Sequence, residues 1–142
     1  MYVPGIEFDG ALPTAEPYFT IGPEFWKRPK NWRELLDAVA WAAKGDIPLQ
    51  VDGPDFLAAN LVEQPEKQRR LVHLVNYDPK KTPFIENIAV KCTVPEGKPA
   101  TAVTLYSIDS DGGEAINFRM QGANAVFSIP RLNTYCIAVV SW

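Results

Sequence analysis

A short apolar run in the middle of the chain constrains its fold most. Residues 71–75 are leucine and valine except for one histidine, His73, and the turn formers Asp78 and Pro79 follow at once. A strand with one face in water alternates apolar and polar residues, whereas a strand covered on both faces is apolar throughout. The run therefore predicts a central strand covered on both faces. Residues 135–140 are also apolar on both faces and predict a second central strand.

From residue 48 onwards the apolar residues recur with a period of two. Further strands are expected over residues 49–52, 56–62, 85–94, 102–108, 115–120 and 125–129. Residues rich in proline, glycine and aspartate separate these runs, and Pro130 is expected to end the last of them. Short strands at such intervals, with turn signals between them, are typical of an antiparallel β-sandwich. We expect a mainly β fold, with about six to eight strands in residues 55–142.

Four residues of the 85–94 run share one predicted inner face: Ile88, Val90, Cys92 and Val94. In the next run, Val103 and Leu105 are expected to point inward for the same reason, because side chains alternate along a strand.

The N-terminal third differs in character. Residues 31–45 predict a helix, with Asn31 as its N-cap, Glu34 completing a capping box and Gly45 just past its end. An apolar face is formed by Trp32, Leu35, Leu36, Val39, Ala40 and Ala43. Trp32 and Trp41 lie about 180° apart on a helix, so they form no common sugar-stacking platform. Trp32 is expected in the core and Trp41 against another element.

Five prolines make residues 1–30 an irregular lead-in, with one short strand over 18–21. We interpret residues 1–54 as this lead-in plus the helix, the remnant of a preceding α/β domain. The boundary to the sandwich is placed between Asp52 and Glu66.

Composition excludes several classes of partner. The net charge is −3 and the pI is about 5.1, and the basic cluster at residues 27–30 is short and broken by Pro29. Nucleic acids and anionic membranes require clustered lysine and arginine, so neither is expected. No run approaches the roughly 20 apolar residues of a membrane span. No signal peptide is visible at the start, and the compartment is left open.

The two cysteines, Cys92 and Cys136, lie inside apolar strand-like runs. The favoured interpretation is two buried free thiols that act as small hydrophobic residues. The alternative is one disulfide between two strands, which an oxidising compartment would favour.

No catalytic, cofactor-binding or metal-binding residue is predicted. His73 is the only histidine and lies within an apolar strand, without a Gly-x-Ser-x-Gly elbow, so it is interpreted as a hydrogen-bonded sheet residue. One histidine and two distant cysteines do not make a zinc site. Residues 109–112 resemble the start of a calcium loop, but Phe118 stands where the pattern needs glutamate. The acidic residues lie mostly in turns, where they are usually solvated or capping.

Aromatic residues leave carbohydrate binding open as an alternative. Six lie in or near the predicted sandwich: Tyr77, Tyr106, Phe118, Phe127, Tyr135 and Trp142. Aromatic faces stack on sugars, although sandwich interiors also need aromatic area.

Most of the chain, from about Tyr18 to Trp142, resembles one group of enzymes. The segments that carry the resemblance are residues 70–77, 88–98, 103–107 and 127–135, with 22–26 and 49–54 upstream. They are similar to the C-terminal β-sandwich of bacterial glycoside hydrolases. Those enzymes have a barrel catalytic domain and a middle domain like the β-galactosidase trimerisation domain.

The resemblance implies a non-catalytic accessory domain, because the catalytic acids of such enzymes lie in the barrel. The expected partners are preceding domains of the same protein or a homo-oligomer partner, and carbohydrate if the sandwich itself binds a glycan.

Overall fold

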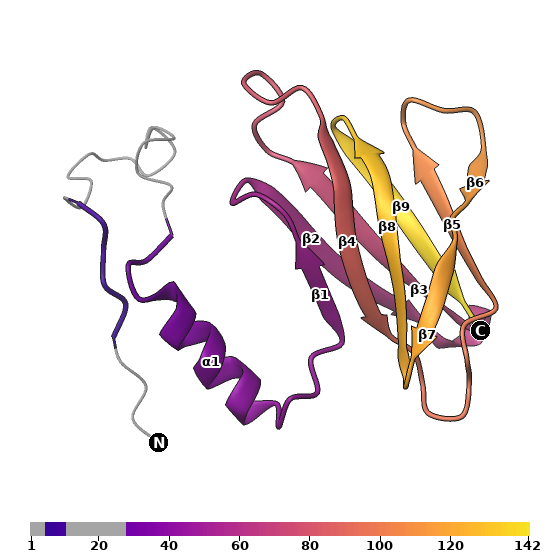
Figure 1. Cartoon of the computed structure of the whole chain (residues 1–142), viewed down its shortest axis with the longest axis horizontal. Coiled ribbons are helices and arrows are strands. Elements are labelled where there is room, and N and C mark those ends of the chain that lie inside the picture. Colours follow the sequence, from indigo (N-terminus) through magenta and orange to yellow (C-terminus); the bar gives the residue numbers. More distant parts are fainter. Residues whose placement is uncertain (1–4, 11–27) are drawn as a thin grey trace. The chain divides into compact units, whose positions relative to one another are not determined.

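A computed structural model describes residues 5–10 and 28–142 of the chain (Figure 1). The chain divides into two compact units, residues 1–47 and 48–142, and each is described by itself. The strand expected over residues 18–21 lies outside the described residues.

The first unit contains the predicted helix as α1, Trp32–Ala42. Gly45 has the expected left-handed conformation, with φ 79°. The prediction of a capping box is wrong, because the Asn31 side chain makes no hydrogen bond that caps the helix. Its amide oxygen instead accepts from the backbone N–H of Glu7 at 3.1 Å, and its amide nitrogen donates to the Gly5 carbonyl at 2.9 Å. Asn31 thus fastens residues 5–7 to the start of the helix.

The expected positions of the two tryptophans also differ from the structure. Trp32 is only half-buried, and the guanidinium groups of Arg28 and Arg33 lie 4.3 and 5.1 Å from its ring centre. Trp41 is 66% exposed, and no residue of α1 is buried. None of the described helices has the length and hydrophobicity that crossing a membrane requires.

The second unit is an antiparallel β-sandwich, as predicted. The four-stranded sheet has the order β1 (Leu49–Asp52), β4 (Ile85–Thr93), β8 (Asn124–Leu132) and β7 (Phe118–Gln121). The five-stranded sheet has the order β2 (Leu57–Gln64), β3 (Arg69–Asn76), β9 (Tyr135–Ser141), β5 (Ala102–Ser107) and β6 (Gly113–Ala115). A short 3₁₀ helix, η3 (Pro65–Lys67), joins β2 to β3. The two sheets pack face to face (Figure 1).

The core lies between the sheets and is built from alternate residues of their strands. The predicted inner residues of β4 and β5 are confirmed, since all are at most 5% exposed. Fully buried side chains come from both sheets, among them Val72, Leu74, Val90, Ile129 and Val140. A hairpin turn joins β7 to β8, with Gln121 opposite Asn124 and Gly122 at φ 60°.

One run that was expected to form a single strand contributes to two strands in different sheets. Residues 115–120 were predicted as a single strand, but the chain crosses from one sheet to the other within them. β6 pairs with β5, whereas β7 pairs with β8. The N–H of Ile116 donates to the Val103 carbonyl at 2.8 Å at the crossing. The side chains of Ile116, Phe118 and Met120 nevertheless all pack against the core.

Pro130 does not end its strand, contrary to prediction. β8 continues to Leu132, which pairs with Ile85 of β4, whereas β7 pairs only with residues 124–127. Beyond them one edge of β8 has no partner strand among the described residues, and proline is tolerated at such an edge.

The division between the units lies earlier than the predicted boundary. β1 pairs with β4 along its whole length, from Leu49 opposite Cys92 to Asp52 opposite Ala89. This strand is therefore part of the sandwich.

The central position of β3 and β9 is confirmed, since each has a strand on both sides. In β9, Val139 and Val140 are buried on opposite faces, whereas Ile137 is half-buried. For β3, the predicted cover on both faces is not found within the described residues. Val72 and Leu74 of β3 are 0% exposed, whereas Leu71, His73 and Val75 on the opposite face are only half-buried.

Candidate functional site

The face of the five-stranded sheet that points away from the core is unusually apolar. We call it the outer face and define it by three rows of opposed residues. The middle row is Asn60, His73, Ile137 and Tyr106; the rows beside it are Val62, Leu71, Val139 and Thr104, and Ala58, Val75 and Tyr135. These three rows contain no lysine, arginine, aspartate or glutamate. The next row of the same face is Gln64, Arg69, Ser141 and Ala102, and it contains one charge, Arg69, whose Nε donates to Gln64 Oε1 at 2.7 Å.

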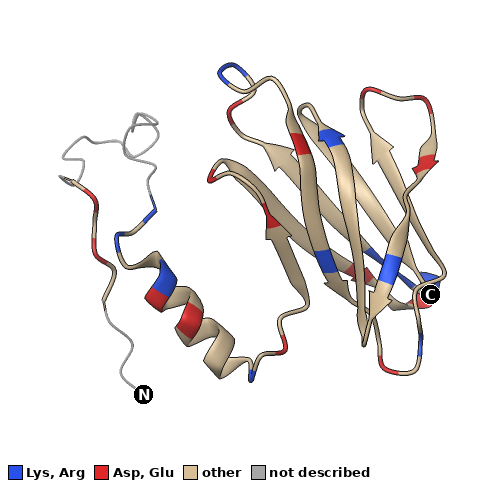
Figure 2. Ribbon diagram, in the orientation of Figure 1, with Lys and Arg blue, Asp and Glu red and all other residues tan. Residues whose placement is uncertain are grey.

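The corresponding face of the four-stranded sheet gives an internal comparison. Its middle row is Gln50, Lys91, Val126 and Arg119, and Asp52 lies in the row beside it. Figure 2 shows these charges as coloured segments on β1, β4 and β7. Such polar residues are usual where an antiparallel sheet faces water. Only the outer face of the five-stranded sheet has the composition of a covered surface.

His73 lies at the centre of the outer face and is hydrogen-bonded. Its Nδ1 is 2.7 Å from the Tyr135 hydroxyl, and the two rings are stacked with centroids 6.1 Å apart. This confirms the prediction of a hydrogen-bonded sheet histidine. The Tyr135 hydroxyl is a donor and an acceptor, so it serves either tautomer of His73.

Tyr106 extends the outer face over the edge strand β6. A Cβ added at Gly113 would lie 2.8 Å from two atoms of the Tyr106 ring and 2.6 Å from the Thr104 methyl group. The glycine therefore leaves room for the ring, which remains 46% exposed. Tyr106 is the most exposed large side chain of the outer face.

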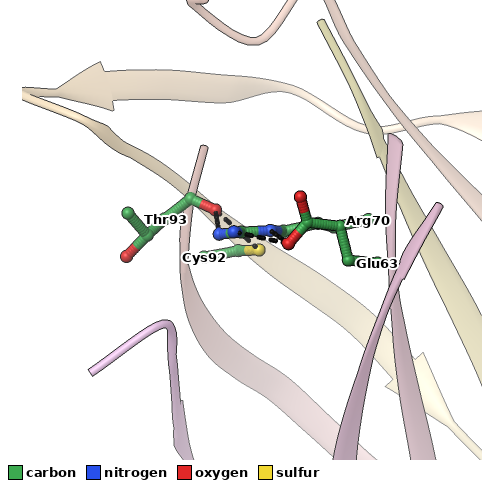
Figure 3. Close-up of polar contacts among 4 residues, drawn as sticks. All are labelled: Glu63, Arg70, Cys92 and Thr93. Carbon is green, nitrogen blue, oxygen red and sulfur yellow. Dashed lines mark hydrogen bonds and ion pairs between the residues drawn. The ribbon is translucent and has the colours of Figure 1, made fainter. Parts of the chain in front are cut away.

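One arginine joins the two sheets at one end of the core (Figure 3). Arg70 of β3 donates through Nη1 to the backbone carbonyl of Thr93 in β4. Its Nη2 donates to Glu63 Oε2 at 2.9 Å, and the Arg70 side chain is only 14% exposed. This is a structural link, because its donors are directed at protein acceptors.

Both cysteines are buried free thiols, as predicted. Burial raises the pKa of Cys92 from 9.0 to about 11, although the nearby positive charge of Arg70 opposes part of the shift. Burial alone raises the pKa of Cys136 to about 12. Both groups are therefore protonated at neutral pH and are poor nucleophiles.

A second polar network lies at the opposite end of β3. The buried Asn76 amide donates to the carbonyls of Thr82 and Asn133 at 2.7 and 2.9 Å and accepts from the Asp78 N–H at 3.0 Å. These bonds hold the β3–β4 and β8–β9 connections together. No buried polar side-chain atom in the described part of the chain lacks a partner.

The calcium-like turn at residues 109–112 is also used structurally. Asp109 Oδ2 accepts from Asn133 Nδ2 at 3.0 Å, and the Asp109 N–H donates to Ser107 Oγ at 3.1 Å. Residues 5–10 and 28–142 contain no cluster of histidine, cysteine or acidic groups suited to a metal ion.

The structure distributes the six candidate aromatic residues between core and surface. Phe127 is buried, and Phe118 and Trp142 pack against the core. Tyr135 is half-buried beside His73, Tyr106 is on the outer face, and Tyr77 is 73% exposed beyond the end of β3. Of the six, only Tyr106 and Tyr135 belong to the outer face.

Sequence reasoning missed the outer face as a unit, although its signal was present. The two runs that are apolar on both sides, residues 71–75 and 135–140, are neighbours in the sheet. Their inner residues build the core, and their outer residues build the apolar face. Pairing the two runs with each other would have located it.

Comparison with known proteins supports the fold. By sequence, the chain matches no known family and no curated protein. By structure, it is similar to α-L-fucosidase isoenzyme 2 from Paenibacillus thiaminolyticus, with a TM-score of 0.65 and 20% identity over 78% of this chain. It is also similar to a cycloisomaltooligosaccharide glucanotransferase from a Paenibacillus species, with a TM-score of 0.52 and 18% identity over 65% of this chain. At these identities the likeness shows the fold alone.

The chain spans only 18% of the fucosidase chain and 16% of the glucanotransferase chain. A similar fold therefore forms a small part of two much longer chains, a fucosidase and a glucanotransferase.

Proposed function

We propose that this chain is a non-catalytic accessory domain of a bacterial glycoside hydrolase or a related carbohydrate-active enzyme. It packs against a catalytic or oligomerisation domain and stabilises it. One observation carries this proposal: the fold matches less than a fifth of two such enzymes. The sequence resemblance to glycoside hydrolase tails agrees with it, and the middle domain expected upstream is of the β-galactosidase-trimerisation kind.

The catalytic acids are assigned to another domain. A glycosidase needs two carboxyl groups about 5–10 Å apart in a cleft. In the enzymes that the sequence resembles, these acids lie in the barrel domain, and this chain resembles only their C-terminal part.

The chain alone is expected to release no nitrophenol from a panel of nitrophenyl glycosides, including the α-L-fucoside and the α-glucoside. Turnover that is lost when a single aspartate or glutamate is changed to its amide would contradict the proposal.

A carbohydrate-binding module is the second candidate, and Tyr106 favours it. Its ring lies over Gly113 and is 46% exposed, which is the arrangement of a single stacking platform. Calorimetric titration with fucose and isomaltooligosaccharides tests this role. Binding that disappears in Tyr106→Ala supports it, and no heat at millimolar sugar removes it.

A further inference from the structure

We propose that the outer face of the five-stranded sheet is the surface that docks an adjoining domain of the same polypeptide. This inference rests on the proposed function and adds the location and the chemistry of the contact. It concerns the eleven outer-face residues defined above and not the four-stranded sheet.

The composition of the face indicates a protein partner that is itself uncharged. Leu71, Val75, Ile137 and Val139 lie side by side across β3 and β9, and Val62 is 38% exposed beside them. A charged group placed against these residues would lose its hydration without a counter-charge, at a cost of several kcal/mol. An apolar partner surface gains from the same burial, about 25 cal/mol per Å².

His73 adds a polar requirement at the centre. Its Nδ1 is occupied by Tyr135 at 2.7 Å, so Nε2 is the ring nitrogen left to the partner. If a partner buried Nε2 without a hydrogen bond, the binding free energy would be less favourable by about 1–3 kcal/mol. The partner surface should therefore be apolar around one hydrogen-bonding group.

The area of the outer face distinguishes between two kinds of partner: an adjoining domain of the same polypeptide and a separate protein chain. The outer face spans four strands and three rows. Neighbouring strands lie about 4.8 Å apart and neighbouring rows about 6.8 Å apart, so the face covers roughly 400 Å². Stable complexes of separate proteins bury about 800 Å² on each partner. Contacts between domains of one chain bury about 300–750 Å² on each side, and the tether raises the effective concentration of the partner surface. An adjoining domain therefore fits this face better than a second copy of the chain.

Two matched substitutions test the docking. Ile137→Glu puts a charge at the centre of the outer face, and Val126→Glu puts the same charge at the centre of the opposite, polar face. Val126 lies between Lys91 and Arg119, so a glutamate there has partners and serves as the control. Tyr106→Glu is a second outer-face variant at a more exposed position, for the case that Ile137→Glu impairs folding.

The measurement is calorimetry on the polypeptide encoded by the whole reading frame that carries this sequence. We expect one joint unfolding transition in the wild type and in Val126→Glu. In Ile137→Glu and Tyr106→Glu we expect two transitions, with that of the sandwich lowered by about 5 °C or more. Outer-face variants that behave like Val126→Glu would overturn the docking face.

Two further results separate this inference from the proposed function. If deletion of residues 48–142 destabilises the remaining domain while Ile137→Glu has no effect, the accessory role stands and the face is wrong. If sedimentation of the 142-residue chain shows a dimer that Ile137→Glu abolishes, the occupant is a second copy and the tethered partner is overturned.

Discussion

The guanidinium of Arg70, on β3, donates to the backbone carbonyl of Thr93, on β4, and thereby connects the two sheets through a single side chain. Arg70 occupies the end of the inner row of β3, whose other members include Val72 and Leu74. The same guanidinium reaches Glu63, its direct neighbour on β2. One largely buried cation thus serves three strands, and its removal should affect stability more than an ordinary surface ion pair does.

We expect Arg70→Leu to lower the free energy of unfolding by about 1–3 kcal/mol, because it removes charge-assisted hydrogen bonds from a mostly buried site. Urea denaturation followed by circular dichroism measures this. Lys81→Ala is the control, since Lys81 is 85% exposed and lies 4.0 Å from Asp78, so it should cost less than about 1 kcal/mol. Equal effects of the two variants would contradict the role given to Arg70.

Asn76→Ala should destabilise the sandwich by about 2–3 kcal/mol. The amide is 2% exposed and its hydrogen bonds join two connections, so its loss leaves buried carbonyls with fewer donors. The matched control is Asn60→Ala on the exposed outer face, expected within about 0.5 kcal/mol of the wild type. The same urea experiment compares them, and a difference near zero would refute the assignment.

Gly113→Ala should destabilise the edge of the five-stranded sheet by about 1–3 kcal/mol, because the new methyl group meets the Tyr106 ring and the Thr104 methyl group. A double-mutant cycle with Tyr106→Ala measures the coupling. The cost of the alanine should fall in the Tyr106→Ala background, where the ring no longer occupies the space. Additive effects would show that the ring does not lie over Gly113.

The two thiols predict a loss of stability at alkaline pH. The pKa of each thiol is raised on folding, so the folded protein keeps its protons while the unfolded chain releases them above about pH 9. The unfolded state then binds fewer protons, and the free energy of unfolding falls as pH rises. This stabilising contribution is complete below pH 9 and is lost between about pH 9 and the folded values of about 11 for Cys92 and about 12 for Cys136.

Urea midpoints from pH 8 to 10.5 measure this decline. The double variant Cys92→Ala/Cys136→Ala should show a shallower dependence on pH, whatever its absolute stability. An unchanged slope would contradict the assignment. In the same preparation, thiol titration without reductant should find two free thiols in urea and almost none in the native protein.

Period-two patterning predicted the sandwich well because each core strand alternates. Ile88, Val90 and Cys92 show that pattern and are buried. The split of residues 115–120 between two sheets could not be predicted in this way. The inward residues keep their alternation across the crossing, so the period of two gives no sign that the hydrogen-bonding partner has changed.

The N-cap prediction failed because the Asn31 side chain has other hydrogen-bond partners. Asn31 is a good N-cap by type, but its amide makes two hydrogen bonds to residues more than twenty positions earlier, and no local sequence pattern predicts such a pairing.

The outer face was partly predictable. The runs around His73 and Ile137 were expected to be covered on both sides, and the docking proposed above would supply the cover on the second side.

The most direct test of the accessory role is deletion of residues 48–142 from a polypeptide that joins this sequence to a catalytic domain, as the proposed function expects. Its unfolding midpoint and its kcat and KM on an aryl glycoside at 20 °C are then compared with those of the intact protein. We predict that the midpoint falls by about 5 °C or more, while kcat and KM stay within about twofold, because the proposed function assigns the chemistry to the remaining domain. An unchanged midpoint, or a collapse of kcat with no loss of stability, would contradict this account.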